Sequence, residues 1–107
     1  MPDSRCRFEY LYRDAGNYKG RGHVLLLGTA TPDNEEAIRA ALIDRLWFVA
    51  EEVGLPTLYH LVREGGEADP GLDHGWHEFV GLGEVGEGDG EPIMTMKMMI
   101  EILRKAR

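Results

Sequence analysis

The chain has 107 residues, of which 43% are hydrophobic and 29% charged, and its formal net charge is −7. This length can build one hydrophobic core but not two, so we expect a single domain over residues 1–107. The negative charge argues against duplex nucleic acid as a partner, because such binding depends on neutralising phosphates, and no apolar run is long enough to span a membrane.

The N-terminus and the cysteine content both favour a cytoplasmic protein. Residues 1–5 lead into no apolar segment of the kind that an export signal requires. Cys6 is the only cysteine, so an internal disulfide is excluded and a reducing compartment is indicated. We expect its thiol to be buried and inert.

Residues 5–13 alternate between an apolar and a charged face, which predicts a β-strand. Residues 14–17 are turn formers, and residues 19–28 resume as a second strand, so a β-hairpin is expected. Its register is left open. A two-residue loop places His23 and Leu25 on the aromatic face of the hairpin. If the hairpin instead contains one additional, bulged residue, Gly20 and Gly22 lie opposite Tyr12 and Tyr10.

A helix is predicted over about residues 32–46. Thr31 can cap its N-terminus, Pro32 suits the first helical position, and acidic residues follow in the first turn. Apolar residues at three- and four-residue spacing run from Ile38 to Leu46, which gives the helix a buried stripe.

The segment after this helix is predicted to be irregular. Trp47-Phe48-Val49 is too apolar for an exposed loop, so we expect it to plug the core. Gly54-Leu55-Pro56 breaks the chain, a short helical turn over 57–62 follows, and the glycine-rich residues 63–75 form a long loop.

The third strand is expected over about residues 76–84. Strict alternation places Trp76 and Leu82 on one face and His77 and Phe79 on the other. A turn rich in glycine follows at residues 86–92.

A second helix is expected from Thr95, which caps it, to about residue 106. The fold class is therefore α+β, with a small antiparallel sheet of about three strands in the order ββαβα and the helices packed on one of its faces.

Polar residues gather at the expected hairpin tip. Residues of these types are common in turns, but together they could also bind an anionic or peptide group through their two cations. They are Arg13, Asp14, Asn17 and Lys19. Trp76, which directly follows the long loop at residues 63–75, completes this candidate ligand site.

A metal site is a second candidate, because Asp73, His74, His77 and Glu78 are ligand types that zinc accepts. In an extended strand His74 and His77 would point to opposite faces, so these residues can chelate only where Gly75 breaks the strand. The alternative is structural: Asp73 and His74 cap the end of the loop, Trp76 packs, and His77 forms a hydrogen bond at the surface.

Four segments together resemble a group of small bacterial proteins with no assigned function. They are Tyr12-Arg13-Asp14, Asn17-Tyr18-Lys19, Val53-Gly54-Leu55-Pro56 and Asp73-His74-Gly75-Trp76-His77-Glu78, and the likeness runs from about Phe8 to Leu82. The chain departs from this pattern at Trp47 to Ala50 and in its methionine-rich C-terminal segment. The resemblance implies a bacterial source and carries no activity with it.

These observations favour a non-enzymatic binding or regulatory module, because no catalytic constellation is recognisable and no cofactor motif is present. The alternative is a metal-dependent, hydrolase-like enzyme that uses Asp73, His74, His77 and Glu78.

The C-terminal helix has an apolar arc of about 200°, roughly twice what docking on one sheet requires. Either the segment around Trp47 and Phe48 covers the remainder, or Met98 and Ile102 face a second copy of the chain. We expect the latter, a homodimer with the two C-terminal helices at the interface.

Overall fold

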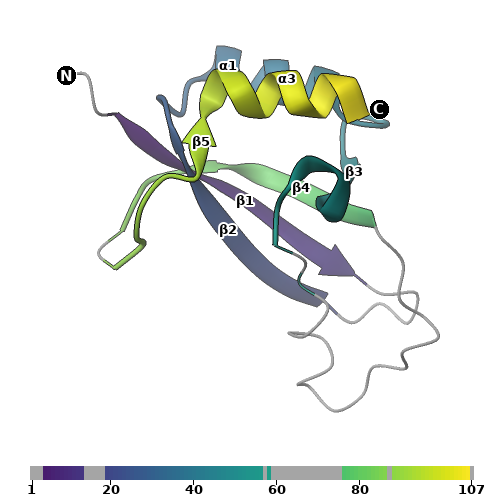
Figure 1. Ribbon diagram of the computed structural model, residues 1–107, viewed down its shortest axis with the longest axis horizontal. Coiled ribbons are helices and arrows are strands. Elements are labelled where there is room, and N and C mark those ends of the chain that lie inside the picture. The colour runs from purple at the N-terminus through teal and green to yellow at the C-terminus, as the bar shows by residue number, and fades with distance from the viewer. Residues whose placement is uncertain (1–3, 14–18, 57, 59–75, 87, 107) are drawn as a thin grey trace.

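The fold is built on a curled sheet that crosses the molecule beneath two helices, as the computed structural model shows (Figure 1). It describes residues 4–13, 19–56, 58, 76–86 and 88–106. The strands are β1 (Arg5–Arg13), β2 (Lys19–Leu27), β3 (Trp47–Val49), β4 (Trp76–Gly83) and β5 (Met94–Thr95). The helices are α1 (Pro32–Ala41), the short 3-10 helix η1 (Ala50–Val53) and α3 (Met96–Ala106).

The expected antiparallel sheet of three strands is wrong. The sheet has five strands in the order β3-β4-β1-β2-β5, and it is mixed because β5 pairs with β2 in parallel. The two additional strands lie at its edges and have only three and two residues. Segments of that length are too short to show the two-residue alternation by which a strand is recognised in a sequence.

The hairpin adopts the second of the two registers. Tyr12 pairs with Gly20 and Tyr10 with Gly22, so the two tyrosines lie opposite glycines. A Cβ atom at Gly22 would lie 2.7 Å from a Leu58 methyl, which means that Leu58 occupies the space a side chain would take. The glycines therefore let the chain after η1 pack directly on β2.

The third strand forms as expected, but its alternation is interrupted. Tyr10 pairs with Phe79, whereas the preceding Glu9 pairs with Gly81, so Val80 is an additional residue in β4. This β-bulge moves Leu82 to the core side, and its predicted place on the face of Trp76 is wrong.

Both helices cover the same face of the sheet and lie side by side (Figure 1). The N-terminal caps form as expected, because Thr31 accepts a hydrogen bond from Asn34 N at 3.1 Å and Thr95 accepts one from Met98 N at 3.1 Å. Cys6 is 1% exposed, and burial raises the pKa of its thiol. The core is formed by residues of β1, β2, β3, β4 and the helices, among them Phe8, Tyr10, Leu26, Ile38, Phe48, Phe79, Met99 and Leu103.

Helix α1 is shorter than expected, because it ends at Ala41 and not at residue 46. Leu42 is the C-cap, and the chain then turns sharply through Asp44 and Arg45, which both have positive φ. Leu46, expected on the helical stripe, lies beyond that turn. Its carbonyl accepts a hydrogen bond from Phe79 N at 2.9 Å.

Two of the expected elements, the helical turn over 57–62 and the long loop over 63–75, lie outside the described residues except for Leu58. No helix in the described part of the chain has the length and apolar character needed to cross a membrane.

Tyr10 should titrate near the alkaline end of the accessible range. Burial raises the pKa of its phenol from 10.0 to about 12, and its hydroxyl donates a hydrogen bond to Pro56 O at 2.6 Å. Because the folded-state pKa is the higher one, the stability that the neutral phenol contributes is complete below pH 10 and is lost as the pH rises towards 12. An ultraviolet titration of the tyrosines should show a late phase that is missing in the Tyr10→Phe variant. Loss of the hydrogen bond should lower the free energy of unfolding of this variant by about 1 kcal/mol. If the titration of Tyr10→Phe still showed the late phase, that phase would not belong to Tyr10.

Candidate functional site

The hairpin tip is only partly within the described residues. Arg13 and Lys19 pair at the ends of β1 and β2, so their backbones are adjacent as expected. Asp14 and Asn17 lie outside the described residues. An anion site at this tip therefore stays a prediction.

His77 belongs to the core. Its side chain is fully buried, and its ring centroid lies 5.1 Å from that of Tyr12 and 5.8 Å from that of Tyr10. Its Nε2 accepts a hydrogen bond from the backbone N–H of Leu58 at 3.2 Å, so this nitrogen carries no proton. His77 is therefore hydrogen-bonded as the structural alternative expected, but it lies in the core and not at the surface.

Glu78 follows His77 in an extended strand and points to the opposite face of the sheet. These two side chains cannot converge on one metal ion. Asp73 and His74 lie outside the described residues, and within the described part no group of three or more His, Cys, Asp and Glu side chains could hold a metal. A site that joins all four residues is therefore not supported by the places of His77 and Glu78, and metal binding by Asp73 and His74 stays a prediction.

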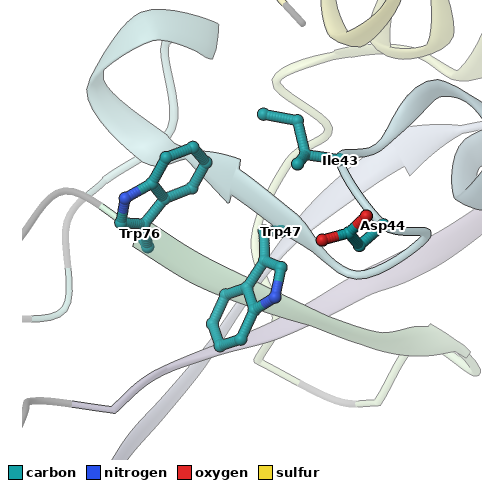
Figure 2. A pocket seen from close by; sticks show the side chains of 4 residues that line it. All are labelled: Ile43, Asp44, Trp47 and Trp76. Atoms are coloured by element: carbon teal, nitrogen blue, oxygen red, sulfur yellow. The ribbon is translucent and has the colours of Figure 1, made fainter.

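Trp76 lines a surface pocket of about 350 Å³ together with Ile43, Asp44 and Trp47. We call these four residues the tryptophan pocket. Figure 2 shows Ile43, Asp44 and Trp47 grouped on one side and Trp76 on the other. Trp76 is 39% exposed and Trp47 is partly exposed, so both indoles are accessible to a ligand.

Pairing of the edge strand brings the two tryptophans together. Val49 pairs with Trp76 and Trp47 with Glu78 in the antiparallel ladder between β3 and β4. Phe48 points into the core, and Trp47 therefore points outward. The expectation that the whole Trp47-Phe48-Val49 segment plugs the core is correct for Phe48 and wrong for Trp47.

A tight turn places Asp44 at the rim. Ile43 and Trp47 exchange backbone hydrogen bonds of 3.0 and 2.9 Å, and the chain between them reverses direction. Asp44 has a φ of 53° and Arg45 a φ of 62°, the left-handed region that residues with a side chain adopt at a cost. Strained backbone of this kind is concentrated at functional sites, and here it borders the tryptophan pocket.

Arg45 is held away from the pocket by an ion pair with helix α1. Its guanidinium donates two hydrogen bonds to the Glu36 carboxylate, at 2.7 and 2.9 Å. These hydrogen bonds lower the pKa of Glu36 and raise the pKa of Arg45. Asp44 is thus the charged side chain among the described pocket residues, and the described part of the rim is negative.

A second polar cluster lies on the opposite side of the sheet from the helices, and sequence reasoning missed it. Asp89 accepts two hydrogen bonds of 2.7 Å from Arg7, one of 2.6 Å from Gly86 N, and lies 3.2 Å from His23 Nε2. The hydrogen bond from Arg7 is the main reason that the pKa of Asp89 lies far below its ordinary value. The Asp89 side chain is 6% exposed, and both of its oxygens accept hydrogen bonds. We therefore assign Asp89 a structural role, which is to hold the turn after β4 against β1.

Comparison with protein-family models, with curated proteins and with solved structures gave no match to this chain. The tryptophan pocket must therefore be interpreted from its own chemistry.

Proposed function

We propose that this protein is a small cytoplasmic, non-enzymatic binding module and that the tryptophan pocket is its ligand site. The observation that carries the proposal is the exposure of two indole rings around one pocket. Exposed tryptophans that line a concave site are typical of binding surfaces, where a large rigid ring supplies contact area at little entropic cost. The buried lone cysteine supports the reducing compartment.

Two further features support a binding role. The volume of about 350 Å³ is in the range of small-molecule sites, towards its lower end. The strained turn at Asp44 and Arg45 costs stability without filling the core, which favours a role at the rim.

Intrinsic fluorescence offers a direct test, because the chain has only two tryptophans and both line this pocket. We expect a screen of amino acids, nucleosides, sugars and organic cations to yield a ligand that changes the tryptophan emission saturably and raises the Tm. Trp76→Ala should weaken that ligand at least about tenfold, since it removes one wall of the site.

Ile93→Ala is the matched control, since Ile93 is an exposed apolar residue (48%) outside the pocket, and it should bind as the unaltered protein does. A ligand that raised the Tm without changing the emission, or that bound Trp76→Ala undiminished, would place the binding site elsewhere. If the screen finds no ligand at all, the proposal is contradicted.

We also propose that the protein forms a homodimer through α3. Met96, Met99 and Leu103 are buried within the subunit, whereas Met98 is 49% exposed and Ile102 is only partly covered. Ile102 packs against the edge of the core, and Met98 is the residue of the arc that faces solvent, where a second copy of the chain could contact it.

Met98→Glu should halve the mass measured by light scattering while the variant keeps its far-ultraviolet circular dichroism, because a carboxylate in the interface would be buried without a partner. Val85→Glu, which alters an exposed apolar residue (39%) after the end of β4 and outside α3, should leave the mass unchanged. An unaltered protein that is monomeric at high concentration would show that the dimer does not exist.

A further inference from the structure

We infer that the tryptophan pocket takes an organic cation, and specifically a methylated ammonium group such as a quaternary ammonium. This inference rests on the proposed binding function and narrows it to one ligand class. Its first support is the chemistry of the walls. Trp47 and Trp76 present indole rings, whose π-faces attract cations more strongly than those of the other aromatic side chains.

The second support is the sign of the charge at the rim. Figure 2 shows the Asp44 carboxylate on the side of the pocket that Trp47 and Ile43 share. The neighbouring cation, Arg45, is turned to Glu36 by two hydrogen bonds and does not line the pocket. A cation entering between the indoles would therefore meet one carboxylate and no opposing charge from the described lining residues.

The third support is the scarcity of hydrogen-bond acceptors among the described side chains of the lining. Ile43 and the two indoles are mainly apolar, and Asp44 alone among the described lining residues supplies carboxylate acceptors. A primary ammonium or a sugar would find carboxylate acceptors only at Asp44 among the described lining side chains, so these side chains give such a ligand little hydrogen-bonded recognition. A trimethylammonium group has no N–H donors, and its methyl groups can pack on Ile43 and on the indole faces.

The rim geometry makes a clean test possible. Asp44→Asn removes the charge and keeps the side-chain shape, and asparagine tolerates a φ of 53° at least as well as aspartate does. Asp33→Asn, at an exposed position in the first turn of α1, makes the same change in net charge outside the pocket and serves as the matched control.

The experiment is a tryptophan-fluorescence titration with choline and with its neutral carbon analogue, in which a tert-butyl group replaces the trimethylammonium. We expect choline to bind about tenfold more tightly than the analogue, because only the cation interacts with the ring faces and the carboxylate. Asp44→Asn should weaken choline by about three- to tenfold and leave the analogue unaffected, while Asp33→Asn changes neither. A peptide that carries trimethyllysine, titrated in parallel, distinguishes a protein side chain from a free small molecule as the source of the group.

The outcomes separate this inference from the function on which it rests. If the neutral analogue binds as tightly as choline, the pocket is a binding site but the charge inference is wrong. If neither binds while another class of ligand from the screen does, the binding function stands and the ligand class is wrong. Equal weakening of choline by Asp44→Asn and Asp33→Asn would also overturn the inference, because it would reflect the net charge of the whole protein.

Discussion

Replacing His77 with alanine is expected to lower the free energy of unfolding by about 3–5 kcal/mol. The change empties a fully buried ring position between Tyr10, Tyr12 and Phe48, whose centroids lie 5.8, 5.1 and 6.0 Å from that of His77. It also removes the acceptor of the Leu58 N–H, and an amide left without a partner in the core adds to the cost of the cavity. A loss of this size is a large share of the total stability of a small domain.

Urea unfolding followed by tyrosine and tryptophan signals measures this loss. His23→Ala is the control, because the His23 side chain is 32% exposed and its contact is the 3.2 Å approach to Asp89. We expect that change to cost less than about 1 kcal/mol. If His77→Ala were as stable as the unaltered protein, the structural role would be wrong. If treatment with a chelator destabilised the unaltered protein as much as the substitution does, His77 would instead be serving a metal.

Local signals predicted those parts of the fold that depend on neighbouring residues. The alternation of β1, the run into β4 and the caps at Thr31 and Thr95 are each contained within a few positions, and each element formed where expected. The parts that were missed depend on distant partners. Strand β5 exists because Met94 and Thr95 meet the end of β2, and Arg7 finds Asp89 across 82 positions of the chain.

The tryptophan pocket shows the same division. Trp76 could be singled out from the sequence, as a large aromatic residue at the start of a strand. Trp47 and Asp44 could not, because their places depend on the turn that ends α1 early. That turn uses two left-handed residues without glycine or asparagine, so it lacks the usual sequence signature, and the helical spacing through Leu46 favoured a longer helix.

Gly28→Ala is expected to lower the free energy of unfolding by about 2–4 kcal/mol, the second large effect. Gly28 follows β2 with a φ of 152°, and its N–H donates a hydrogen bond to Ser4 O at 2.8 Å. A Cβ atom there would lie 2.7 Å from the Cβ of Met96, the first residue of α3. Because a Cβ atom cannot rotate away from its own backbone, either α3 or the end of β2 must shift.

Two other glycines separate the causes of this loss. Gly54 has a φ of 76°, and a Cβ atom there would meet none of the described atoms within 4 Å, so Gly54→Ala measures the cost of the conformation alone, about 1 kcal/mol. Gly22 has an ordinary φ, and its close neighbour at 2.7 Å is a Leu58 methyl at the end of a side chain that can rotate, so Gly22→Ala should fall between the other two. Urea unfolding of the three variants should therefore rank Gly28→Ala as the most destabilised. If Gly28→Ala and Gly54→Ala lost equal stability, the contact between the end of β2 and the start of α3 would not be as close as the structure has it.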